Sequence, residues 1–163
     1  MRKSIAIFGG SLFQDIIYSN GKYIPTNKQA SIKLSNNYKI DNYSLQGLSI
    51  QRVKKLLLQL PMKELYSDCI LALGEADLTD VETFATTIEE IIEYLQENHV
   101  HPLLVSLPQS FMKDARGVEI QKILDEVAVS KNVDYIYDGT TQKQVSYMVI
   151  EDCDFEQAIL NLC

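Results

Sequence analysis

The chain has 163 residues, of which 46% are hydrophobic and 23% are charged, and its formal net charge is -7. A chain of this length fits one domain, residues 1–163, with a single hydrophobic core. The acidic balance argues against a nucleic-acid partner, because phosphate backbones are bound by clusters of Lys and Arg. No segment approaches the roughly 20 apolar residues of a membrane span, so we expect no membrane partner.

The N-terminus and the cysteines bear on the cellular compartment. The apolar run at residues 5–8 is too short for the apolar region of a secretory signal peptide. The three cysteines are odd in number and lack the spacing of metal ligands, which is typical of a reducing compartment. We therefore expect a cytoplasmic protein without a disulfide framework.

Five short apolar segments are typical of buried β-strands. The first is SIAIF at residues 4–8, which two glycines follow at once. The others are residues 38–43, 69–73, 103–107 and 133–137. Each is short, rich in β-branched, aromatic or leucine side chains, and bounded by polar or turn-forming residues.

Segments with helical periodicity separate most of these strands. Residues 49–60, 81–98 and 114–131 carry apolar side chains at helical spacing, and a short fourth helix is expected at residues 155–162. The alternation predicts an α/β domain of three layers, α/β/α, around a mostly parallel five-stranded sheet with a flavodoxin-like strand order.

The one irregular region is residues 15–37. Within it, Asn20-Gly21 lies between two apolar pairs, which is the signature of a two-residue hairpin turn. We expect a small β-hairpin that overhangs the end of the first strand.

Glycine-containing turns follow the first three predicted strands, at residues 9–11 (GGS), 42–47 (NYSLQG) and 74–77 (GEAD). In a parallel sheet such turns meet at the carboxyl edge, where ligands bind. Glycines also make ordinary turns, but the joint spacing resembles the sequence blocks of the SGNH, or GDSL-type, hydrolases. The segments YSNGKYIPTNKQA and DNYSLQG further resemble a group of small bacterial cytosolic members of that family.

The resemblance implies an SGNH-hydrolase fold and acyl-ester hydrolase ancestry. It assigns Ser11 as the nucleophile, and it assigns the backbone N–H groups of Ser11 and Gly47 as oxyanion donors. Asp152 occupies the position of the carboxylate that orients the base. The binding crevice is expected to include Gly10, Asn42, Gly47, Ala76, Asp77 and Phe155.

The chain departs from the family pattern at three positions. Gly10 stands where the family's first block has an aspartate, and Ala76 stands where the family has the asparagine that donates to the oxyanion. Phe155 stands at the position of the histidine that acts as the base. One lost oxyanion donor costs about 10² to 10³ in turnover, and a lost triad base costs on the order of 10⁶. We therefore expect weak or absent esterase activity, with the crevice binding a small acyl ester, an acetylated carbohydrate or a protein partner.

An active serine esterase with a non-standard base remains the alternative. His99 and His101 precede the strand at residues 103–107 and so lie at the opposite edge, too far from Ser11 for proton transfer. We interpret both as surface or loop histidines. Asp152 or Asp154 could act directly on Ser11, although an exposed carboxylate is a weak base for a hydroxyl.

Cofactor and metal sites find little support in the sequence. The glycines lack the spacing of a dinucleotide-binding turn, and a flavin-binding module would rest on strand order alone. Several acidic residues near the turns could bind a hard cation. They are more simply interpreted as helix caps and turn residues. These residues are Glu75, Asp77, Asp80, Asp152 and Asp154. We expect no cofactor and no metal, and the oligomeric state does not follow from the sequence.

Overall fold

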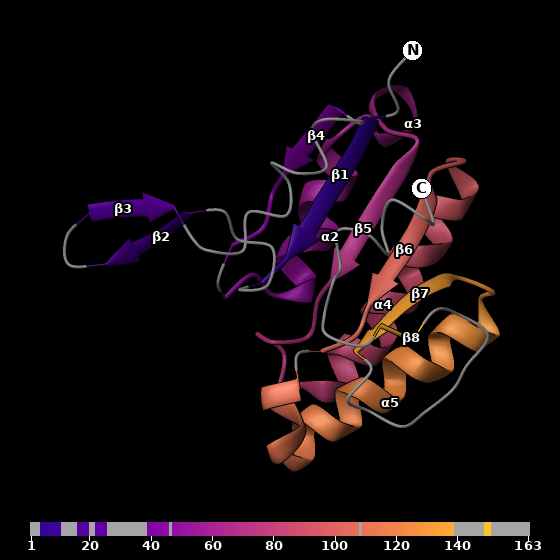
Figure 1. Ribbon diagram of the computed structural model, residues 1–163. Helices are drawn as coiled ribbons and strands as arrows, with labels where there is room; N and C mark the ends of the chain where they lie inside the picture. The colour runs from indigo at the N-terminus through magenta and orange to yellow at the C-terminus, as the bar shows by residue number, and fades with distance from the viewer. Residues whose placement is uncertain are drawn as a thin grey trace.

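The computed structural model of the protein describes residues 4–10, 16–19, 22–25, 39–45, 47–107, 109–138 and 149–150. Six strands form one sheet in the order β4-β1-β5-β6-β7-β8 (Figure 1). They are β1 (Ser4–Gly9), β4 (Lys39–Asn42), β5 (Asp68–Ala72), β6 (His101–Val105), β7 (Asp134–Asp138) and β8 (Val149–Ile150).

All neighbouring strands of this sheet are parallel. The order β4-β1-β5-β6-β7 confirms the predicted five-stranded sheet. Strand β4, the second of the five predicted strands, lies outside β1, and β5, β6 and β7 follow on the other side of β1. The two-residue strand β8 extends the sheet beside β7 and was not predicted, because two residues carry no periodicity.

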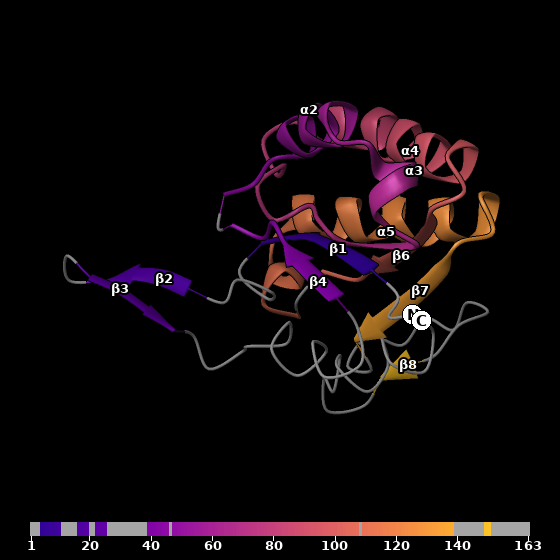
Figure 2. The same ribbon diagram turned by 90° about the horizontal axis from the view of Figure 1, so that it is seen from above.

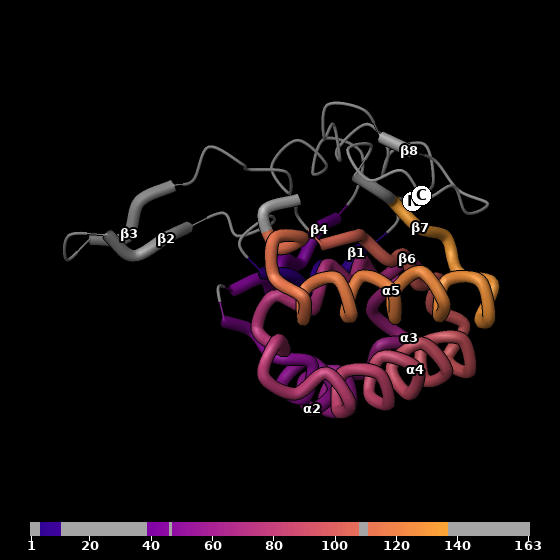
Figure 3. The backbone as a smooth tube through the Cα atoms, turned by 90° about the horizontal axis from the view of Figure 1, so that it is seen from below, coloured from indigo at the N-terminus to yellow at the C-terminus, as the bar shows by residue number. Residues whose placement is uncertain are grey.

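The helices of the described chain are α2 (Ile50–Gln59), α3 (Met62–Leu65), α4 (Val81–Glu97) and α5 (Ala115–Ser130), with a 3-10 helix, η1 (Gln109–Lys113). Figure 2 shows the three long helices on one face of the sheet. Figure 3 shows the same layer from below, and α4 packs against both α2 and α5. The predicted helix at residues 155–162 lies outside the described residues.

None of the helices in the described ranges has the length and apolarity needed to span a bilayer.

Both faces of the sheet are buried. On the helix side, Ala6 and Phe8 of β1 join the core cluster that also contains Ile88 of α4 and Leu124 of α5. Successive side chains of a strand point to opposite faces, and Ile7, which points away from the helices, is also fully buried. The described helices form one layer on this sheet, and the second helix layer of the predicted α/β/α arrangement is not seen in the described part of the chain.

Strand β6 begins two residues earlier than the sequence indicates. His101 pairs with Asp68, and Pro102 pairs with Cys69 in the parallel ladder. A proline lacks the backbone N–H that a central strand uses, so it disfavours a strand in sequence-based prediction. Pairing with β5 overrides that local preference.

The predicted hairpin is confirmed by β2 (Ile16–Ser19) and β3 (Lys22–Pro25), which pair antiparallel. Ser19 lies opposite Lys22, so two residues connect the strands. Those residues are Asn20-Gly21, the dipeptide from which the turn was predicted.

Candidate functional site

The three predicted glycine turns meet at the carboxyl edge of the sheet. Leu45 N–H donates to the Gly9 carbonyl at 3.0 Å, which joins the turn after β4 to the end of β1. On the other side of β1, Gly10 N–H donates to the Ala72 carbonyl at 3.3 Å. The turns that follow β4, β1 and β5 therefore lie side by side, as their sequence positions indicated.

Some of the predicted site residues are described and others are not. The described ones are Gly10, Asn42, Gly47, Ala76 and Asp77. Ser11, Asp152 and Phe155 lie outside the described residues. The roles assigned to these three remain predictions.

Gly47 lies in a turn and has a backbone conformation that favours glycine. Its φ angle is 84°, in the left-handed region that glycine adopts without strain. The residue is exposed, and no group of the described chain accepts a hydrogen bond from its N–H. Within the described ranges, this N–H is therefore unpaired at the carboxyl edge of the sheet.

Asn42 and Ser44 shape the turn between β4 and Gly47. The Asn42 side-chain oxygen accepts a hydrogen bond from Ser44 N–H at 3.0 Å, which is an Asx turn. The Ser44 hydroxyl oxygen is buried and has no hydrogen-bond partner within the described ranges. It lies 3.2 Å from the position that a Cβ on Gly9 would occupy, between the ends of β4 and β1. Sequence reasoning missed this hydroxyl.

The carboxylate of Asp77 binds the start of α2. Ile50 N–H donates to its two oxygens at 3.1 and 3.3 Å, and the residue is 7% exposed. Burial raises the pKa of Asp77, and the Ile50 hydrogen bond opposes that rise. Anionic groups are favoured at a helix N-terminus, so Asp77 joins the turn after β5 to α2.

Ala76 occupies the position between Glu75 and Asp77 where the resemblance expects an asparagine. The residue is partly buried and presents a methyl group, which cannot donate a hydrogen bond. The described part of this edge thus lacks, at position 76, the side-chain amide that the resemblance expects beside Gly47.

Glu75 places a carboxylate directly over Gly10. A Cβ built on Gly10 would overlap the Glu75 carboxylate, with the carboxylate carbon 2.8 Å away. Glycine at position 10 therefore makes room for Glu75, a partly buried residue of the neighbouring turn. Sequence reasoning considered Glu75 as a cation ligand and missed this contact. The sequence signal for this contact was Gly10, where the family's first block has an aspartate, together with the acidic Glu75 in the third block.

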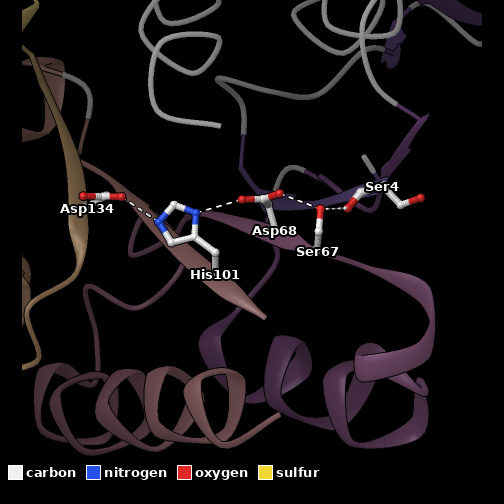
Figure 4. A network of polar contacts seen from close by, with 5 residues as sticks. All are labelled: Ser4, Ser67, Asp68, His101 and Asp134. Carbon is white, nitrogen blue, oxygen red and sulfur yellow. Dashed lines mark hydrogen bonds and ion pairs between the residues drawn. The ribbon is translucent and has the colours of Figure 1, made fainter. Parts of the chain in front are cut away.

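A second polar cluster lies at the opposite, amino edge of the sheet (Figure 4). His101 Nδ1 is 2.8 Å from Asp68 Oδ1, and His101 Nε2 is 2.6 Å from Asp134 Oδ2. The Ser67 hydroxyl lies 2.6 Å from Asp68 Oδ2 and 3.2 Å from the Ser4 carbonyl. The cluster links the first residues of β1, β5, β6 and β7.

Both histidines lie at the amino edge, as expected; a loop position is wrong for His101, although its side chain is 36% exposed. His99 is exposed, whereas His101 is the first residue of β6 and is held between two carboxylates. The hydrogen bond with Asp68 raises the pKa of His101, Asp134 adds to the rise, and partial burial opposes it. Ser67 contacts the carboxylate and not the imidazole, so this cluster is not a nucleophile–base pair.

The acidic residues near the turns do not gather around a common point in the described chain. Asp80 caps α4 by accepting from Thr83 N–H at 3.2 Å, and Asp77 contacts α2. Among the residues described, no three His, Cys, Asp or Glu side chains are placed to hold a metal ion.

Neither a protein-family model nor a curated protein matches the chain. Solved structures do match. A protein from Desulfitobacterium hafniense assigned to the G-D-S-L family of lipolytic proteins aligns with a TM-score of 0.69 and 16% identity, over 92% of this chain and 85% of that one. The lipase/acylhydrolase from Enterococcus faecalis aligns with a TM-score of 0.63 and 18% identity, over 83% and 75% of the two chains.

The esterase EstA from Pseudoalteromonas, in a structure inhibited by monoethylphosphonate, aligns with a TM-score of 0.61 and 15% identity over 85% of this chain and 78% of that one. Likeness at such identities shows a shared fold. The chain therefore has the fold of the SGNH/GDSL hydrolases, in agreement with the expectation drawn from its three glycine turns.

Proposed function

We propose that the protein is of acyl-ester hydrolase ancestry and binds a small acyl ester or acetylated carbohydrate at the carboxyl edge of its sheet, with weak or no esterase activity. The observation that carries this proposal is the methyl group of Ala76 where a side-chain oxyanion donor is expected. Because charge develops on the carbonyl oxygen in the transition state, a missing donor weakens catalysis more than it weakens binding.

The described edge keeps features that suit the binding of a carbonyl compound. Gly47 N–H is available as a donor, and the buried Ser44 hydroxyl lacks a partner within the described residues. Among the proteins with this fold is an acetyl xylan esterase, whose name gives the class of ester to test first.

Binding is tested by two-dimensional amide NMR with an acetylated xylo-oligosaccharide and, separately, its deacetylated form. The proposal predicts saturable shifts at Gly47 and Ser44 for the acetylated compound, with turnover at the uncatalysed rate or slightly above it. Shifts of equal size for both compounds would contradict recognition of the acyl group.

A second candidate function is ester hydrolysis in which Glu75 acts as the base for Ser11. The observation that favours it is the Glu75 carboxylate seated over Gly10, the residue before Ser11. In that reaction Glu75 accepts the hydroxyl proton while Ser11 Oγ attacks the ester carbonyl. The bond to the alcohol then breaks, the alcohol takes the proton, and water hydrolyses the acyl-serine by the same steps.

Covalent labelling separates the two functions. A fluorophosphonate that reacts with an activated serine is followed by intact-mass spectrometry in the unmodified protein, in Ser11→Ala, in Glu75→Gln, and in Glu82→Gln as an exposed control. Rapid labelling that is lost in Ser11→Ala and Glu75→Gln but kept in the control would establish the hydrolase. No labelling above that of Ser11→Ala is the result expected for the binding protein.

A further inference from the structure

An apolar cavity of about 370 Å³ lies on the helix side of the sheet, between the turn after β4 and the first two turns of α2. Its lining residues are Tyr43, Leu45, Leu48, Arg52, Lys55 and Leu56. They include none of the predicted site residues. The volume lies within the range of about 300–1,000 Å³ that is usual for small-molecule sites.

The floor of this cavity is held in place by the core. The Tyr43 ring stacks on Phe8, with ring centroids 4.9 Å apart and an angle of 10° between the planes. The Tyr43 hydroxyl is 2.6 Å from the Tyr66 hydroxyl, which in turn donates to Asp41 at 2.7 Å. Because the polar end of Tyr43 is engaged in this chain of hydrogen bonds, its ring presents a fixed apolar surface to the cavity.

The side of the cavity formed by α2 combines leucine and cationic side chains. Arg52, Lys55 and Leu56 lie in α2 at the spacing that places side chains on one face of a helix, and Leu48 lies just before the helix. Leu45, which also lines the cavity, is 49% exposed, so an apolar ligand there would cover it.

The two cations at this cavity lack ion-pair partners in the described chain. Lys54, which lies between them in sequence but does not line the cavity, pairs with Glu90. No carboxylate of the described ranges pairs with Arg52 or Lys55, although the chain as a whole carries a net charge of -7. An unpaired guanidinium beside an ammonium attracts an anionic group, and a guanidinium can bind a carboxylate through two hydrogen bonds.

We infer that this cavity binds a single-chain fatty acid, with the hydrocarbon chain against Tyr43, Leu45, Leu48 and Leu56 and the carboxylate between Arg52 and Lys55. The apolar floor suits a hydrocarbon chain, and the two cations complement its charged end. The inference does not depend on Ser11 or on ester chemistry, because none of the lining residues belongs to the proposed crevice.

The test is isothermal titration of the protein with sodium decanoate below its micelle concentration. We expect saturable one-to-one binding with a dissociation constant below about 1 mM. The double variant Arg52→Glu/Lys55→Glu should bind about tenfold more weakly or worse, because it replaces two cations with two anions. The matched control is Lys63→Glu/Lys113→Glu, which makes the same change of charge at two exposed lysines outside the cavity and should bind as the unmodified protein does.

Two further variants locate the ligand and separate this inference from the proposed function. Leu45→Asp changes an exposed side chain, so it should fold normally and should lose decanoate binding. Ser11→Ala should retain it. Decanol, which lacks the charge, should bind about tenfold more weakly than decanoate.

Absence of saturable decanoate binding would overturn the inference, as would equal affinity in the Arg52→Glu/Lys55→Glu variant and its control. Tighter binding of decyl phosphate than of decanoate would contradict the assignment of a fatty acid. Binding to anionic phospholipid vesicles without binding of decanoate would contradict it as well.

Discussion

The His101 cluster at the amino edge of the sheet and the turn after β4 at its carboxyl edge differ in whether their polar groups have partners. At the amino edge, Asp68 and His101 are surrounded by partners, with both ring nitrogens of His101 held by carboxylates. At the carboxyl edge, Gly47 N–H and the Ser44 hydroxyl have no partner in the described chain. Satisfied polar groups stabilise a fold, whereas unsatisfied ones call for an explanation, which our proposal supplies as the binding of a ligand at this edge.

The largest expected effect concerns the amino edge. Asp68→Ala removes a carboxylate that is 3% exposed and that contacts both His101 and Ser67. Because the substitution removes one hydrogen-bond partner from each of them at a buried position, we expect it to lower the free energy of unfolding by about 2–4 kcal/mol. Urea unfolding measures the loss.

Asp134→Asn serves as the control, since Asp134 is 48% exposed on its side chain and should contribute less than about 1 kcal/mol. Equal losses in the two variants would contradict the view that Asp68 is the centre of the cluster.

The second prediction restores the expected chemistry at the carboxyl edge. Ala76→Asn combined with Phe155→His introduces an oxyanion donor and an imidazole at the positions that the resemblance assigns to them. We expect at least about a tenfold increase in hydrolysis of p-nitrophenyl acetate, equivalent to about 1.4 kcal/mol of transition-state stabilisation. The gain should disappear when Ser11→Ala is added. An unchanged rate in a folded double variant would mean that Phe155 does not occupy the base position.

The third prediction addresses the backbone at Gly47. A Cβ at this position meets no atom of the described residues within 4 Å, so the cost of Gly47→Ala comes from the φ angle of 84°. We expect a loss of about 1 kcal/mol in the free energy of unfolding, with Gly47→Asn less costly because asparagine tolerates this conformation. Thermal unfolding of the two variants gives the comparison, and an equally stable Gly47→Ala would argue against this turn geometry.

The smallest effect is the dependence of stability on pH. The pKa of His101 is raised above its ordinary value of 6.5, chiefly by the hydrogen bond with Asp68. Its contribution to stability is therefore fully present below pH 6.5 and is lost as the pH rises through the folded-state pKa. Urea unfolding measured from below pH 6.5 upward should show the free energy of unfolding decline, and His101→Gln should remove that decline. An unchanged decline in His101→Gln would assign the titration to another group.

The fold was largely predictable because its signals are local. Runs such as residues 4–8 and 69–73 are apolar enough to identify buried strands, and glycine turns mark where they end. Asn20-Gly21 likewise specifies its hairpin through two residues. The start of β6 at His101 was missed because strand pairing, a non-local interaction, overrides the local signal of Pro102.

The contacts of the site were harder to predict, because they depend on which strands become neighbours. Glu75 reaches Gly10 across 65 positions of sequence only because β5 pairs with β1. In the same way, His101 meets Asp68 and Asp134 because β6 lies between β5 and β7. No periodicity or motif within one segment carries that information.

The most direct test of the proposed function is the rate of p-nitrophenyl acetate hydrolysis by the purified protein, compared with that of Ser11→Ala under the same conditions. A weakly active or inactive binding protein should give a rate at or just above that of Ser11→Ala. A rate of about 10³ or more above Ser11→Ala would contradict the proposal and would establish Ser11 as an activated nucleophile.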